Sequence, residues 1–167
     1  TLLLGVLFLP VSTLEQRLQM IVAGVCAQQH FLYIGTYTMP LCARNTGIYS
    51  GFLASVLFLL AIGRKRAAKL PPLAITLFLL GTIGLLAIDG FNSLALDLGG
   101  YNLYTPDNRL RVITGLGMGM TIGTFLLLMF NLSLRYDADH QQRVVGSWIE
   151  VLGMIGAAAL LYGLFFF

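Results

Sequence analysis

Long runs of apolar residues, separated by short polar segments, dominate this chain. Four runs are long enough to cross a hydrocarbon core of about 30 Å, which needs about 20 helical residues. They lie at about residues 45–63, 70–91, 110–133 and 144–167. Backbone polar groups inside lipid must be satisfied locally, so such runs span membranes as helices. The pattern predicts an all-α, polytopic membrane helix bundle, with residues 1–167 forming a single transmembrane domain.

The N-terminal part carries two further apolar patterns. Residues 1–11 are apolar but too short to span, so we expect them to end a transmembrane helix that starts before this sequence; a signal-peptide remnant is the alternative. Ser12 and Glu15 have the spacing of a capping box. Apolar residues then recur at helical spacing, which predicts an amphipathic helix over about 13–29, lying at the interface or in the bundle mouth.

The composition agrees with a membrane protein. The chain is 57% hydrophobic and 10% charged, whereas about 25% of residues are charged in a soluble domain. Its mean hydropathy is +0.85 and its net charge is +3. These values exclude a soluble enzyme and a disordered module, and no basic stripe interleaved with aromatic residues indicates nucleic-acid binding.

Basic residues in short loops orient such a bundle, because Lys and Arg stay on the cytoplasmic side. They gather in the segments 64–69 and 135–143, so we expect these two loops to be cytoplasmic. By parity, the segments 12–44 and 92–109 share the outer face.

Polar residues from three separate stretches should therefore meet at the outer face. Charges at membrane depth are usually paired or functional, so we expect Asp89 to pair with Arg44 or Arg111. The alternative is that these residues are helix-end anchors facing headgroups and water. The expected outer-face polar cluster contains Cys26, His30, Cys42, Arg44, Asp89, Asn92, Asn108, Arg109 and Arg111.

The segment CAQQHFLYIGTYTMPLCARNTGIYSG, residues 26–51, resembles the signature of an uncharacterised bacterial membrane family, domain-of-unknown-function family 2085. The later segments DGFN, residues 89–92, and PDNRLRVITG, residues 106–115, look like the second half of that family. Many members have a further Cys where Asn45 stands here. The resemblance implies a multi-pass protein of the bacterial cytoplasmic membrane and a shared site, but no reaction.

The two cysteines leave several kinds of site open. Cys26 and His30 would share a helix face and could bind a metal with Cys42, but zinc normally takes four ligands and Asn45 replaces the fourth. A disulfide between Cys26 and Cys42 is favoured, because the outer face should meet an oxidising compartment. Buried thiols and a Cys–His nucleophile are the alternatives. His30 and His140 lie on opposite membrane sides, so we expect neither haem nor any other metal or cofactor.

Small residues repeat at four-residue spacing in the third and fourth runs. Such spacing lets two helix backbones approach closely, and we expect it to pack helices within the bundle rather than to form a dimer seam. The residues concerned are Gly115, Gly117, Gly119, Gly123, Gly153 and Ala157.

Glu150 is placed about two turns inside the last apolar run, 144–167. We expect it to pair with Arg143 or to extend toward the interface. A proton-relay role is less favoured, since a single carboxylate makes no chain.

The favoured function is a non-catalytic accessory or scaffolding subunit of a larger membrane complex, because the loops are short and the Gly- and Phe-rich helix faces suit protein and lipid contact. A quinol-oxidising respiratory or photosynthetic electron-transfer complex is the suggested host. The alternative is a small membrane enzyme or lipid-binding protein that acts on a phospho-headgroup at the outer face, held by Arg44 and Arg111. A transporter ranks third. The expected partners are membrane lipids and other membrane subunits, not nucleic acid.

Overall fold

The computed structural model describes residues 22, 31–34 and 37–166. The apolar residues 1–11 lie outside this part of the chain, as does the expected helix over 13–29 apart from Val22. Within the described residues the fold consists of four long helices and two short two-stranded sheets. The helices are α3 (Ala43–Ala61), α4 (Leu73–Asp97), α5 (Asn108–Leu134) and α6 (Trp148–Phe166). The strands are β1 (Phe31–Ile34), β2 (Tyr37–Cys42), β3 (Ala67–Lys69) and β4 (Asp139–Arg143).

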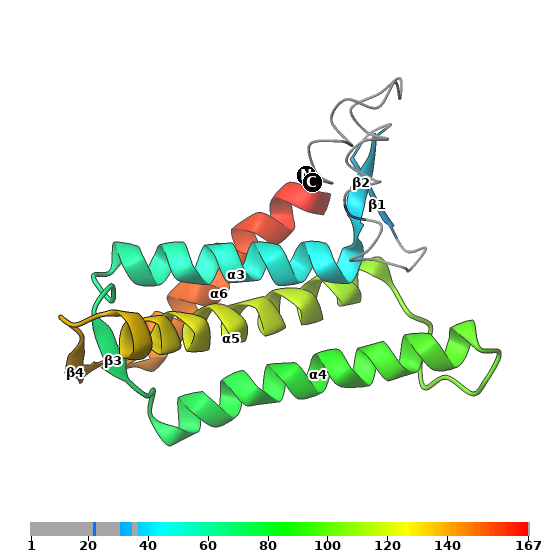
Figure 1. Cartoon of the computed structure of the whole chain (residues 1–167). Coiled ribbons are helices and arrows are strands. Elements are labelled where there is room, and N and C mark those ends of the chain that lie inside the picture. Colours follow the sequence, from blue (N-terminus) through cyan, green and yellow to red (C-terminus); the bar gives the residue numbers. More distant parts are fainter. Residues whose placement is uncertain (1–21, 23–30, 35–36, 167) are drawn as a thin grey trace, which may run out of the picture.

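Helix α5 is the centre of the bundle. It runs alongside α3, and this is the most extensive helix–helix contact in the described chain, while α4 packs on another side of α5 (Figure 1). Helix α6 packs mainly on α3. The bundle is therefore an α3–α5 pair with one more helix attached to each partner.

Glycines make the α3–α5 contact a contact between backbones. A Cβ atom added at Gly51 would lie 2.9 Å from the Cα atom of Leu116, and one added at Gly119 would lie 2.6 Å from the backbone nitrogen of Phe52. Neither position has room for a side chain, which is the close approach that small residues permit inside membranes. The glycines in this contact are Gly47, Gly51, Gly115, Gly119 and Gly123. Gly153 of α6, by contrast, lies against a side chain, the ring of Phe58.

Two threonines join α4 to α5. The hydroxyl of Thr82 lies 2.8 Å from that of Thr121 and donates to the carbonyl of Gly117 at 3.0 Å. Thr121 in turn donates to the carbonyl of Leu79 at 2.9 Å. Because both hydroxyls are buried and bonded, they link two otherwise apolar helix faces without leaving an unsatisfied polar group.

The two loops rich in basic residues meet at one end of the bundle. Strands β3 and β4 pair in parallel, with the backbone N–H of Asp139 donating to the carbonyl of Arg66 at 2.7 Å. Asn131 of α5 donates to the carbonyl of Ala67 at 2.8 Å, and Val144 is fully buried beneath the strands. The segments 64–69 and 135–143 therefore lie at the same end, as parity requires of two loops on one membrane side.

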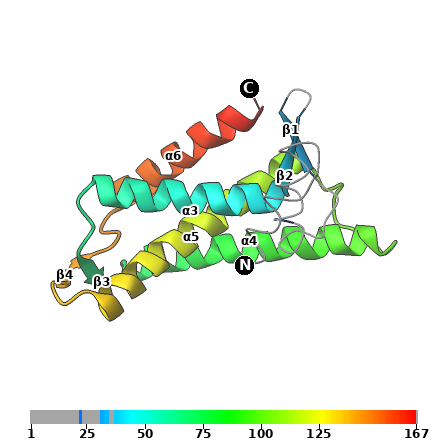
Figure 2. The same ribbon diagram turned by 45° about the horizontal axis from the view of Figure 1, so that its top comes forward.

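Helices α4 and α6 approach each other at this end and diverge toward the other (Figures 1 and 2). Where they approach, the ring of Phe78 packs edge-on against Trp148, with ring centroids 5.6 Å apart. The divergence leaves one side of α5 uncovered between them.

The expectation of four complete spans is confirmed only in part. Two helices of the described chain, α4 and α5, are long and apolar enough to cross a membrane. In α3 the first turn contains Arg44, Asn45 and Thr46, which shortens its apolar part. The run 144–167 does not begin as a helix: Val144 and Val145 are fully buried ahead of α6, which starts at Trp148.

The late start of α6 also corrects the expected position and partner of Glu150. This residue lies in the first turn of α6 rather than two turns inside a span. It pairs with Arg64, not with Arg143, and accepts the backbone N–H of Gly146 at 2.7 Å. A carboxylate at a helix N-terminus interacts favourably with the helix dipole, so Glu150 joins the end of α3 to the start of α6.

Replacing Gly119 by Ala should lower the free energy of unfolding by about 1–3 kcal/mol, because the new methyl group must push two backbones apart. Reversible unfolding in detergent, followed by helical circular dichroism, measures this. Gly84→Ala is the matched control, since nothing lies within 4 Å of a Cβ there; it should be neutral or raise stability by up to about 1 kcal/mol, because Ala favours a helix interior over Gly. Equal effects of the two substitutions would show that the α3–α5 contact is not close.

Candidate functional site

An ion pair between Arg44 of α3 and Asp89 of α4 lies at the end of the bundle opposite β3 and β4. Arg44 donates from Nη2 and Nε to Oδ2 of Asp89, at 2.5 and 3.2 Å. The same Nη2 donates to the hydroxyl of Ser93 at 3.2 Å. Asp89 is 1% exposed and Arg44 9%, so the pair is shielded from solvent. Of the two partners expected for Asp89, the structure therefore gives Arg44.

A residue of the loop between α4 and α5 donates a hydrogen bond to the second carboxylate oxygen of Asp89. Tyr104, between α4 and α5, donates its hydroxyl to Oδ1 of Asp89 at 2.8 Å. Asn92 fixes this loop, because it donates to the carbonyl of Tyr104 at 2.9 Å and accepts the backbone N–H of Leu103 at 2.6 Å. Both oxygens of Asp89 are thus engaged by side chains of the protein.

Arg111 lies in the first turns of α5, beside the same group of residues. It donates from Nη1 to Oδ1 of Asn108 at 2.9 Å, and Asn108 donates to the carbonyl of Phe31 at 3.1 Å. Arg111 is 4% exposed, yet its Nε has no hydrogen-bond partner. Arg111 is therefore a buried cation whose donors are not all used by the residues that the structure describes.

Five members of the expected outer-face cluster are brought together: Arg44, Asp89, Asn92, Asn108 and Arg111. Cys42 ends β2 and is buried directly before α3, two residues from Arg44, and Arg109 is exposed on α5.

Cys26 and His30 lie outside the described residues. The disulfide between Cys26 and Cys42, the metal alternative and the Cys–His nucleophile all depend on those two residues. Each of these ideas remains a prediction.

Helix periodicity explains part of the cluster. Asn92 and Ser93 come three and four residues after Asp89, so all three lie on the face of α4 that turns toward the bundle. The same spacing could have identified Ser93 as a further partner. Tyr104 comes from an irregular loop, where no periodic signal exists.

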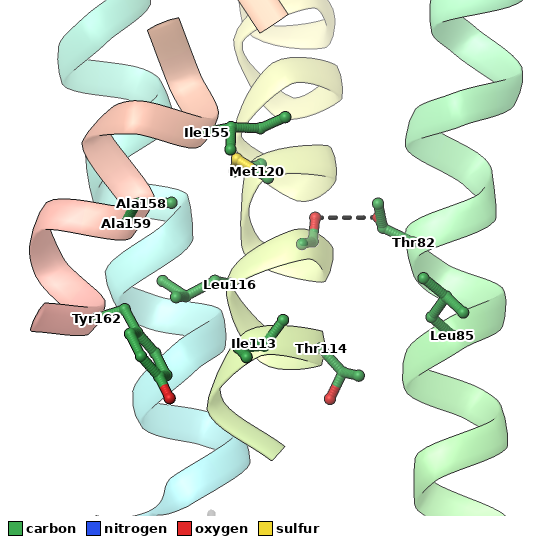
Figure 3. A pocket seen from close by; sticks show the side chains of 11 residues that line it. Thr82, Leu85, Ile113, Thr114, Leu116, Met120, Ile155, Ala158, Ala159 and Tyr162 are labelled. Carbon is green, nitrogen blue, oxygen red and sulfur yellow. Dashed lines mark hydrogen bonds between the residues drawn. The ribbon is translucent and has the colours of Figure 1, made fainter. Parts of the chain in front are cut away.

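The open side of α5 forms an apolar groove of about 380 Å³ between α4 and α6 (Figure 3). Its floor is α5, with Gly117 and Met120, and its walls are Leu85 of α4 and Ala159 of α6. The remaining lining residues are Thr82, Ile113, Thr114, Leu116, Ile155, Ala158 and Tyr162. Sequence reasoning missed this groove, because it arises from the divergence of two helices and not from any motif.

The groove offers few polar groups. The hydroxyl of Thr82 donates to the carbonyl of Gly117, and that of Thr114 donates to the carbonyl of Leu110 at 3.0 Å. Both hydroxyls are therefore already used within their own helices or between them. Tyr162 brings a third hydroxyl, and the rest of the groove lining is apolar side chain and helix backbone.

Comparison with known proteins identifies a family for this chain. The profile of a family described as a predicted membrane protein, DUF2085, matches residues 26–125, which is more than half of the 167-residue chain. No curated protein and no solved structure matches the chain significantly. The match covers β1 to the middle of α5 and so includes the Arg44–Asp89 pair and Arg111.

Replacing Arg44 by Met should lower the free energy of unfolding by about 3–5 kcal/mol, because it leaves the buried Asp89 carboxylate without its cation. The double variant Arg44→Met with Asp89→Leu should recover part of that loss, since no carboxylate is then left without Arg44, although Arg111 also loses the nearby charge of Asp89. Unfolding in detergent measures all three proteins, with Arg109→Met as an exposed control. A single-variant effect no larger than that of the control would contradict a stabilising role for the pair.

The pKa of Tyr104 provides a test by pH. Burial, followed by the hydrogen bond to the Asp89 carboxylate, raises the pKa of this phenol above its ordinary value of 10.0. The folded state then favours the protonated phenol, so its contribution to stability is complete below pH 10.0 and is lost as pH rises through the raised pKa. Tyr104→Phe should be less stable than the wild type at pH 8, and the difference should shrink under alkaline conditions. A constant difference would refute this coupling.

Proposed function

We propose that this chain, which belongs to the DUF2085 family of predicted membrane proteins, is a non-catalytic accessory subunit of a larger membrane complex. The observation that carries the proposal is the apolar groove on α5 between α4 and α6. Its proposed occupant is an apolar transmembrane helix of a partner subunit.

The lining of the groove supports a helix as the occupant. Gly117 on the floor and Ala158 and Ala159 on one wall are small, and small residues let a second helix approach to backbone distance. The same device already joins α3 to α5 inside this chain. A helix seated there would contact α4, α5 and α6 together.

The hydroxyls of the two lining threonines already donate hydrogen bonds within the chain, which supports an apolar occupant. Pockets for small ligands orient them with a few well-placed polar groups. Here Thr82 and Thr114 direct their hydroxyls to backbone carbonyls of the chain itself. A helix presenting Leu, Val and Phe side chains needs no such groups.

The polar cluster supports a structural rather than a catalytic role for Asp89. Both of its carboxylate oxygens are hydrogen-bonded, one to Arg44 and one to Tyr104. A general acid or base must come within hydrogen-bond reach of a substrate, whereas Asp89 is 1% exposed. Asp89 instead holds α3, α4 and the following loop together.

The proposal has two further parts, which rest on the sequence. The end that carries β3 and β4 is proposed to face the cytoplasm, because it bears the basic loops 64–69 and 135–143. The first host to test is a quinol-oxidising respiratory or photosynthetic electron-transfer complex of the cytoplasmic membrane. Membrane lipids are the proposed neighbours of the remaining exposed apolar side chains.

The second candidate function, an enzyme or lipid-binding protein for a phospho-headgroup, has one observation in its favour. Arg44 is engaged by Asp89 and Ser93, so it does not form a two-arginine clamp with Arg111. Arg111, by contrast, has a buried Nε with no hydrogen-bond partner among the described residues. A binding role is therefore better supported than catalysis on a headgroup.

Native purification in a mild detergent, with mass spectrometry of everything that travels with the chain, tests the accessory role. The wild type should purify with stoichiometric partner subunits. Ala159→Trp should lose them, because the indole fills the groove. Leu160→Trp is the matched control on the next residue of α6, which is 75% exposed and lies off the groove lining; it should keep them.

Three outcomes would overturn the proposal. The first is that the wild type migrates alone, and the second is that both Trp variants retain partners equally. The third is that the wild type purifies only with lipid or with further copies of this chain.

A further inference from the structure

Among the described residues, the buried charges at the Arg44–Asp89 end do not balance. The buried charged side chains in the described part of the chain are Arg44, Arg111 and Asp89. Asp89 gives both of its oxygens to Arg44 and Tyr104. Two cations therefore share one carboxylate, and a buried charge without a counter-charge is strongly unfavourable.

Arg111 is the cation left without a carboxylate. No ion pair joins it to an acid among the described residues, and its Nε has no partner. Asp89 acts on Arg111 electrostatically but is already bound by Arg44, whereas Asp97 and Asp107, which also act on it, are exposed, so solvent and salt screen them. The guanidinium has five donors, of which one is accounted for by Asn108.

The position of Arg111 adds a second feature that favours an anion. Helix α5 begins at Asn108, and its N-cap residue Asp107 makes no side-chain capping bond. The first backbone N–H groups of this helix therefore keep the partial positive charge of a helix N-terminus. The bond from Nη1 to Asn108 holds the Arg111 guanidinium beside that same turn.

We propose that Arg111 and the N-terminus of α5 bind a phosphate oxyanion, supplied by an anionic lipid headgroup or by free phosphate. Arginine suits this ligand, because its planar donors match phosphate oxygens. The bound anion would supply the missing negative charge, and it would lie where a helix end meets the headgroup region. This inference does not depend on the accessory role, since the groove and this site are different surfaces.

The test uses the full chain, stripped of lipid in a non-ionic detergent and freed of phosphate. Three additions are compared: phosphatidylglycerol, phosphatidylcholine and inorganic phosphate. Thermal unfolding and native mass spectrometry report binding. Phosphatidylglycerol should raise the Tm and remain bound, whereas phosphatidylcholine should do so much less. Protection by inorganic phosphate as well would identify free phosphate as a sufficient ligand, and its failure would assign the site to the lipid.

Arg111→Gln removes the charge while keeping a donor for Asn108, and should weaken phosphatidylglycerol binding about tenfold or more. Arg109→Gln, an exposed neighbour on the same turn, should stay within about twofold of the wild type. Arg111→Lys keeps the charge but not the planar fork, so its affinity should fall between those of the wild type and Arg111→Gln.

The anion-free state separates this proposal from an internal ion pair. Without lipid or phosphate, Arg111→Gln should be at least as stable as the wild type, because it removes an uncompensated charge. A marked loss of Tm in that state would show that a carboxylate of the chain already neutralises Arg111, and would overturn the proposal. Failure of phosphatidylglycerol and phosphate alike to raise the wild-type Tm would overturn it without any variant.

Discussion

The backbone contact between α3 and α5 determines where the buried charges lie. Gly115 faces the carbonyl of Arg44 itself, so the closeness of the two helices at this point sets how near Arg44 and Arg111 can come. A side chain at Gly115 would move α3 outward and carry Arg44 away from Asp89. Helix packing and the polar cluster therefore depend on each other. The small residues let α3 and α5 approach closely, and the Asp89 carboxylate offsets the repulsion between the two arginines that this approach brings together.

Sequence reasoning predicted the features that have a period or a charge. The four-residue spacing of Gly115, Gly119 and Gly123 pointed to close helix packing, and the rarity of charges inside apolar runs pointed to Asp89 with Arg44 or Arg111. Sequence reasoning did not predict the features that depend on tertiary structure. Glu150 looked like an intramembrane acid because hydropathy alone does not locate a helix start, and Tyr104 gave no signal because loop geometry has no repeat.

The two ends of the bundle treat charge differently. At the β3–β4 end the ion pair of Arg64 and Glu150 is partly exposed and joins helix termini, so water also solvates the two charges. At the other end Asp89 and Arg111 are almost fully buried, and each lost partner matters more because the local dielectric is low. A substitution of the same chemical kind should therefore have unequal effects at the two ends.

The parallel pairing of β3 with β4 has a consequence for the order of folding. The two strands flank the α4–α5 hairpin, so the bond from Asp139 to the carbonyl of Arg66 closes a loop that contains both helices. Contacts of such long sequence separation form late, because the chain entropy of closure must be overcome first. We therefore expect β3 and β4 to pair only after the α4–α5 hairpin has assembled. Their pairing then fixes the position at which α6 starts.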